Sequence, residues 1–124
     1  MKALRSHAVG GPETLTLDEV ESPVPGPGQV RVRVKACSIN FPDVLIIQDL
    51  YQFKPARPFA PGGEASGVVD AVGEGVTQRK VGDRVIASTG NGALAEEIVV
   101  DAARLWALPD YASVVPGAAP LMRP

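Results

Sequence analysis

Residues 58–85 contain several glycines whose spacing suggests a phosphate-binding site, because glycine-rich turns can hold phosphate groups. A dinucleotide-binding turn needs glycines at its first, third and sixth places, after a strand and at the start of an amphipathic helix. Gly62 and Gly67 have the outer spacing, but Glu64 stands between them. A second glycine cluster follows a strand-like run, but Gln78 replaces its last glycine. These glycines therefore predict β-turns and no phosphate cradle.

Five further residues are candidates for binding or catalysis, namely three basic residues, one histidine and one cysteine. Arg31, Arg33 and Lys35 alternate along one strand-like segment, and such a row is more typical of a solvated face than of an anion site. His7 is the only histidine, and with nothing nearby to orient its ring we expect a surface position. Cys37 is expected to be a small buried hydrophobe, with a thiol of lowered pKa beside Lys35 as the alternative.

The composition limits the class of protein. The chain has 124 residues, 45% of them hydrophobic, with 13 Gly and 12 Pro, which suits one mostly β domain of short strands and turns. A net charge of −2 with interspersed signs argues against a nucleic-acid partner. The single Cys and the lack of an apolar span of about 20 residues predict a cytoplasmic protein without a membrane partner.

The elements that must position these residues are mostly strands. From Val30 to Ala36 apolar and charged residues alternate strictly, which predicts a strand with one buried face. Residues 40–48 predict a two-turn helix, with Asn40 or Phe41 at the cap and Asp43 near the positive end of the helix. We expect further strands over residues 2–7 and 14–20, which form a hairpin, and over residues 68–72, 84–88, 96–100 and 104–108.

Several connections invite specific expectations. Glu64 follows two glycines and is expected on a tight turn. Asn91 and Gly92 form a dipeptide typical of hairpins. Trp106, without a second aromatic or basic cluster beside it, is expected to anchor the packing of the last strand rather than to stack on a base.

Together, several segments resemble one known family. Besides residues 58–85 they are Gly11-Pro12-Glu13, Pro25-Gly26-Pro27-Gly28, Asn40-Phe41-Pro42-Asp43 and Ala95-Glu96. Their order and spacing resemble the medium-chain dehydrogenase/reductase superfamily, in its zinc-independent NADPH:quinone oxidoreductase branch. The resemblance implies a mostly β, GroES-like, partly open β-barrel with one or two short helices. It implies a catalytic domain over residues 1–109, and an irregular tail at 110–124 where a nucleotide-binding domain would start.

The resemblance also implies which residues form the site. Asn40, Asp43 and Glu64 match positions in relatives that hold a carbonyl or enone against the nicotinamide, with Asp43 equally suited to helix capping and Glu64 expected to line the cleft. The zinc-dependent branch has a cysteine in place of Asn40 and a histidine in place of Gly63, so no zinc is expected here. NADPH would be bound mainly by a domain absent from this chain.

The function implied is hydride transfer from a nicotinamide to a quinone or enone. The 124-residue chain alone is expected to be inactive because it lacks the nucleotide-binding domain. Two alternatives remain open: a stand-alone, non-catalytic GroES-like domain that binds a partner or small ligand, and a zinc alcohol dehydrogenase. A homo-oligomer is also left open. The family usually has glycine at the position of Asp49, which predicts a left-handed backbone there.

Overall fold

The computed structural model describes residues 1–108 of the chain, and these residues fold into two sheets with one α-helix. The seven strands are β1 (Lys2–Arg5), β2 (Thr16–Glu19), β3 (Gln29–Ser38), β4 (Glu64–Val72), β5 (Arg84–Ser88), β6 (Glu97–Asp101) and β7 (Leu105–Ala107). The helices are α1 (Phe41–Ile47) and two single 3₁₀ turns, η1 (Pro12–Thr14) and η2 (Ala102–Arg104). The predicted mostly β, GroES-like fold is confirmed. The expected tail at 110–124 lies outside the described residues.

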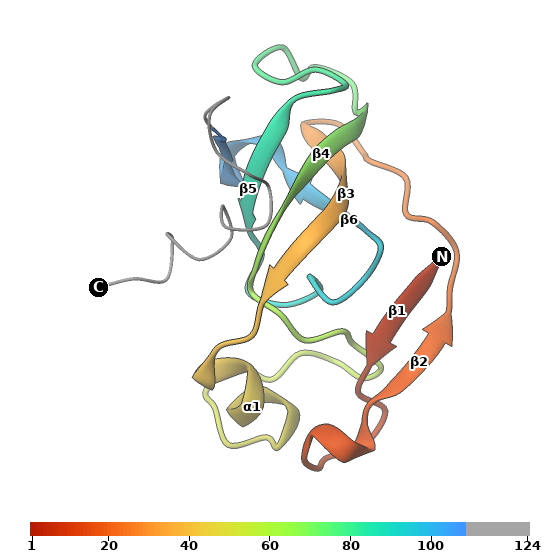
Figure 1. Ribbon diagram of the computed structural model, residues 1–124, viewed down its shortest axis with the longest axis vertical. Helices are drawn as coiled ribbons and strands as arrows, with labels where there is room; N and C mark the ends of the chain where they lie inside the picture. The colour runs from red at the N-terminus through yellow and green to blue at the C-terminus, as the bar shows by residue number, and fades with distance from the viewer. Residues whose placement is uncertain (109–124) are drawn as a thin grey trace.

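The sheets form an incompletely closed barrel. The main sheet has the strand order β6-β3-β4-β5-β7, and β1 and β2 form the predicted antiparallel hairpin. The hairpin meets the main sheet where Ala3 of β1 pairs with Ala95 just before β6 (Figure 1). Beyond this bridge, a groove lined by residues of both strands lies between β1 and β6. The expected partly open barrel is therefore present.

The core lies on the inward face of β3 and its neighbours. Val30 and Val32 are fully buried, as the alternation predicts, and pack with Val69, Val85 and Ile98 of the adjoining strands. The charged residues between them point outward. This apolar cluster fixes the register of the sheet, because a shift by one residue would bring the charged side chains into the core.

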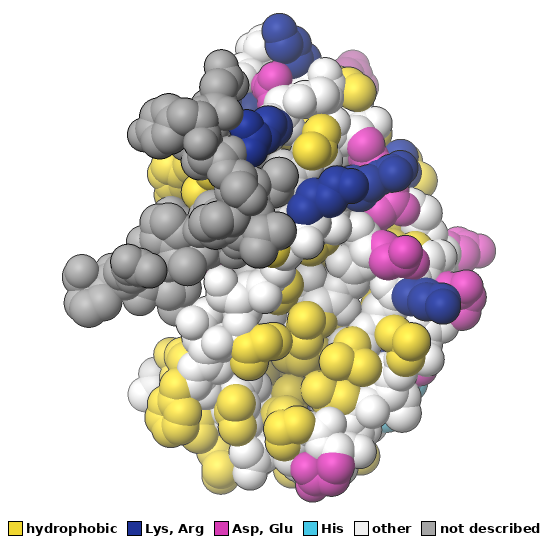
Figure 2. All heavy atoms as spheres, viewed as in Figure 1, with side chains coloured by type: hydrophobic (Ala, Val, Ile, Leu, Met, Phe, Trp, Pro, Cys, Tyr) yellow, Lys and Arg dark blue, Asp and Glu magenta, His cyan; other side chains and the backbone are white. Residues whose placement is uncertain are grey.

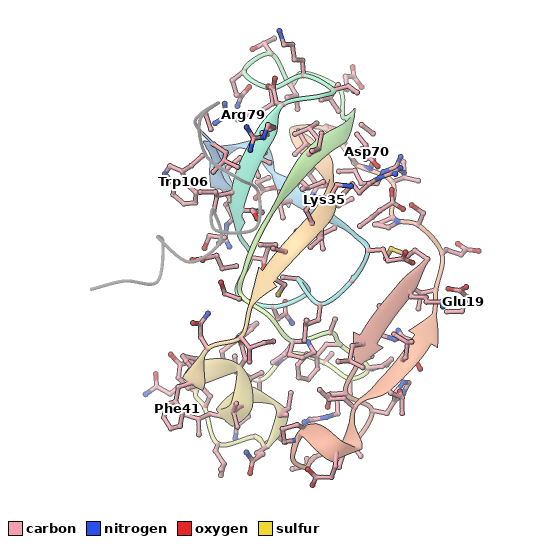
Figure 3. The ribbon with its side chains drawn as sticks, viewed as in Figure 1. Glu19, Lys35, Phe41, Asp70, Arg79 and Trp106 are labelled. Carbon is pink, nitrogen blue, oxygen red and sulfur yellow. The ribbon has the colours of Figure 1, made fainter. Side chains whose placement is uncertain are left out.

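Two expectations about connections are wrong. The Asn91-Gly92 dipeptide does not join a hairpin, because β5 and β6 are separated in the sheet by β3 and β4. Gly92 instead takes a φ of 97°, and its N–H donates to the carbonyl of Ala60. Trp106 is not a packing anchor. It lies on the edge strand β7 with 48% of its surface exposed (Figure 3).

Candidate functional site

The start of α1 is organised by two of the predicted site residues. Asn40 is extended, with φ −125° and ψ 164°, and its backbone N–H donates to Oδ2 of Asp43 at 2.9 Å. In return the Asp43 N–H donates to the Asn40 carbonyl at 3.0 Å. A carboxylate at this position also interacts favourably with the helix dipole. Asn40 rather than Phe41 is thus the cap, and the buried Asp43 holds it in place.

A pocket of about 270 Å³, which we term the α1 pocket, opens beside this cap. Its floor and walls come from α1, from the segment that follows it, and from the turns before β4 and after β5. The lining residues are Asn40, Pro42, Asp43, Ile46, Tyr51, Phe53, Gly63, Ser88 and Gly90. Figure 2 shows hydrophobic side chains gathered over α1 and its surroundings on this face. The pocket therefore offers apolar and aromatic walls with a few polar groups, as small-ligand sites do.

Glu64 lies beneath the α1 pocket and does not line it. It is the first residue of β4, not a turn residue, and only 1% of its surface is exposed. Burial raises the pKa of its carboxyl group, and a hydrogen bond from Ser38 Oγ to Oε1 at 3.4 Å offsets part of that effect. Its neighbour Gly63 and its cross-strand partner Ser88 do line the pocket. Glu64 therefore does not line the α1 pocket, although it adjoins two residues that do, and its expected place in a cleft between two domains stays a prediction.

Cys37 lies near the two acidic residues. The pKa of its thiol is raised to about 11, chiefly by burial and in addition by the nearby carboxylates of Asp43 and Glu64. The thiol also packs under Gly62, where an added Cβ would lie 2.9 Å from its sulfur. Cys37 is thus a small hydrophobe packed against the core, as expected, although it is only partly buried. The alternative of a lowered pKa beside Lys35 is wrong.

Arg31, Arg33 and His7 form ion pairs away from the α1 pocket. Arg31 Nε lies 2.8 Å from Oδ1 of Asp70 on β4 and 3.2 Å from Oε2 of Glu97 on β6. These carboxylates neutralise much of the basic row, so it is no anion site. His7, although exposed, does have an orienting partner, because its Nε2 lies 2.6 Å from Asp18 Oδ2.

Sequence reasoning missed most of the pocket wall. Tyr51 and Phe53 were not singled out, although two aromatic residues directly after a short helix were the available signal. Ser88 carried no local signal, because its place follows from the pairing of β4 with β5. A larger groove of about 500 Å³ lies between β1 and β6, but none of the three predicted site residues lines it. The α1 pocket is therefore the candidate site.

Comparison with known proteins places this geometry in a family. The alcohol dehydrogenase GroES-like domain matches residues 26–110, which is more than half of the sequence. The chain belongs to this domain family. The expected membership of the medium-chain dehydrogenase/reductase superfamily is confirmed, since its relatives include quinone oxidoreductases and VAT-1 homologues.

Three relatives illustrate the relation of this GroES-like domain to longer proteins. The rat synaptic vesicle membrane protein VAT-1 homolog is 49% identical over 88 residues, 71% of this chain and 22% of its own length. Mouse quinone oxidoreductase is 38% identical over 121 residues, 96% of this chain and 37% of its own length. The structure of Escherichia coli quinone oxidoreductase complexed with NADPH matches with a TM-score of 0.91 and 35% identity, over 97% of this chain and 37% of that one. The matched part of the chain thus covers between 22% and 37% of the length of these proteins.

Two further observations concern metals and membranes. Among residues 1–108, no group of three or more His, Cys, Asp or Glu side chains is arranged to hold a metal ion. Within the same residues, no helix has the length and hydropathy needed to cross a membrane.

Proposed function

We propose that this GroES-like domain is the substrate-side part of a zinc-free, NADPH-dependent oxidoreductase that acts on quinones or enones. The observation that carries the proposal is the α1 pocket, which is lined by the helix-capping residue Asn40 and by the aromatic residues Tyr51 and Phe53. A planar ring fits between such walls because aromatic side chains contribute large apolar contact areas. Relatives named quinone oxidoreductase support the same substrate class.

The residues present fit only part of a dinucleotide. Pyrophosphate is usually held at the N-terminus of a longer helix that follows a glycine turn. Here α1 has seven residues, and the carboxylate of Asp43 already occupies the region of its first N–H groups. The pocket beside Asn40 has room for a flat ring, as the nicotinamide end or the substrate would require. The described residues therefore suit the reacting end and not the phosphates.

The proposal assigns tasks to several residues of the pocket and to Glu64 beside it. NADPH, when bound, supplies the hydride. The side-chain amide of Asn40 donates a hydrogen bond to the substrate carbonyl, and Asp43 fixes the backbone from which that amide projects. Tyr51 and Phe53 hold the ring and exclude water, and Glu64 supports Gly63 from below. In this proposal Asn40 is the residue that contacts the substrate, and Asp43 and Glu64 are positioning residues, with Glu64 outside the pocket lining.

The experiment is a titration of the ¹⁵N-labelled chain, followed by NMR. With 2,3,5,6-tetramethyl-1,4-benzoquinone (duroquinone) we expect chemical-shift changes concentrated at Asn40, Tyr51, Phe53, Gly63 and Ser88. With NADPH alone we expect a dissociation constant weaker than about 10 μM, or roughly −7 kcal/mol, because the phosphate site is not in these residues. Quinone-induced shifts confined to the groove between β1 and β6 would refute the proposed site.

A further inference from the structure

The segment that supplies the aromatic wall has few contacts of its own. Residues 51–56 make no hydrogen bond to any other residue of the described part of the chain. Tyr51 and Phe53 are 40% and 45% exposed, although both line the α1 pocket. A segment without backbone hydrogen bonds keeps one conformation only if its two ends are fixed. What fixes its two ends therefore decides whether the wall is formed.

Arg57 connects both ends of this segment to the body of the domain. Its Nη1 lies 3.0 Å from Oδ1 of Asp49, and its Nη2 donates to the carbonyl of Ile47 at the end of α1 at 2.9 Å. Its Nε donates to Oγ of the fully buried Ser6 at 3.1 Å. The guanidinium also lies over the ring of Phe59, 5.4 Å from the ring centre. All three guanidinium nitrogens are thus engaged, an arrangement that lysine could not reproduce.

Asp49 is the partner that begins the segment. It has a φ of 57°, and among residues 1–108 it is the only residue other than glycine with a positive φ. Aspartate tolerates this conformation better than most residues, but at some cost relative to glycine. The ion pair with Arg57 is partly buried, with 19% of the arginine and 35% of the aspartate side chain exposed. The charge at position 49 thus gains a contact that glycine could not make.

We propose that the Asp49–Arg57 ion pair positions residues 50–56 so that Tyr51 and Phe53 form the aromatic wall of the α1 pocket. Asp49 and Arg57 are positioning residues, since neither lines the pocket. The consequence for ligand binding rests on the proposed function, whereas the ordering of the segment does not.

The first arm of the test measures the order of the segment without any ligand. Backbone ¹⁵N order parameters are measured for the wild type, Arg57→Gln, Asp49→Asn and the double variant. We expect the order parameters of the amides of residues 51–54 to fall below about 0.6 in each variant, while those of α1 stay near 0.85. Because Arg57→Gln already removes the contact with Asp49, the double variant should be no more mobile than Arg57→Gln. Asparagine also tolerates a positive φ, so Asp49→Asn tests the charge and not the backbone.

The matched control is Arg33→Gln, which removes an exposed arginine on β3 whose nearest carboxylate oxygen is 3.8 Å away. It should leave residues 50–56 as ordered as in the wild type. Wild-type order in Arg57→Gln would overturn the proposal.

The second arm measures the affinity for duroquinone. We expect a loss of about tenfold in Arg57→Gln and Asp49→Asn, and the same loss in the double variant. A loosened segment with unchanged affinity would show that the ion pair does not position a binding wall. If the wild type binds no duroquinone, the proposed substrate class fails, while the order parameters still decide whether the ion pair orders the segment.

Discussion

At the residue scale, the site depends on a carboxylate that ligands do not reach. Glu64 is buried at the start of β4, next to Gly63 and opposite Ser88, and both of these line the α1 pocket. Its pKa is raised by burial, so the charged form opposes folding. A buried carboxylate retained at such a position is typical of a site in which geometry takes precedence over stability.

The pH dependence of stability tests this view of Glu64. A carboxyl group whose pKa is higher in the folded than in the unfolded chain binds more protons when folded, so its effect lowers stability as the pH rises above about 4.5. Glu64→Gln keeps an oxygen acceptor for Ser38 and removes the charge. We expect the variant to be more stable than the wild type at pH 7, with the difference vanishing as the pH falls toward 4.

Urea titrations at several pH values measure the difference, and Glu74→Gln, at an exposed position, provides the control. A destabilised Glu64→Gln at pH 7 would mean that the carboxylate is stabilised by a partner.

At the element scale, close contact between β3 and β4 is what brings Glu64 to Ser38. Gly67 in the middle of β4 permits it, because an added Cβ would lie 2.1 Å from the carbonyl oxygen of Arg33 and 3.1 Å from Cγ1 of Val32. The ladder also shifts register between Val34 and Ala36. A glycine inside a strand often marks such a close approach of two backbones.

Gly67→Ala should therefore lower the free energy of unfolding by about 1–3 kcal/mol, because the strands must separate to admit the methyl group. Gly26→Ala is the matched control. Its Cβ would meet only the end of the flexible Gln29 side chain, so we expect a change within about 0.5 kcal/mol. Urea denaturation measures both, and equal stabilities for the two variants would contradict the close approach.

Local signals predicted the elements well. The alternation from Val30 to Ala36 predicted β3, and the start signals Asn40 and Asp43 predicted α1. The left-handed backbone of Asp49 was predicted from the family resemblance, because the family usually has glycine there. The expectations that failed depend on contacts between distant segments. Asn91-Gly92 resembles a hairpin turn, but β5 pairs with β4 and β7 and not with β6, the next strand in the chain. Trp106 is exposed because β7 is an edge strand, and residue type does not reveal an edge.

The candidate site was predictable only in part for the same reason. Asn40 and Asp43 sit on a local motif, so their mutual geometry could be expected. The burial of Glu64 and the position of Ser88 follow from a ladder between residues more than 20 apart. The hydrogen bond from Arg57 to Ser6 joins residues that are 51 positions apart in the sequence. No spacing rule connects such pairs.

At the scale of the whole molecule, the absence of zinc remains a prediction. The positions that hold a cysteine and a histidine in the zinc-dependent branch are Asn40 and Gly63, and neither offers a thiolate or imidazole. After incubation with excess zinc and desalting, elemental analysis should find well below one zinc per chain. One tightly held zinc per chain would instead favour the alternative of a zinc alcohol dehydrogenase.

The most direct test of the central claim transfers this domain into a complete enzyme. Residues 1–108 would replace the matching segment of Escherichia coli quinone oxidoreductase, whose structure they resemble with a TM-score of 0.91. We predict NADPH oxidation that depends on duroquinone. With Asn40→Ala in the chimera, kcat/KM should fall by about 10²-fold while NADPH affinity is unchanged, because one hydrogen-bond donor to the reacting carbonyl is lost. A folded chimera that binds NADPH but reduces no quinone, or an Asn40→Ala variant with unchanged kcat/KM, would contradict the account.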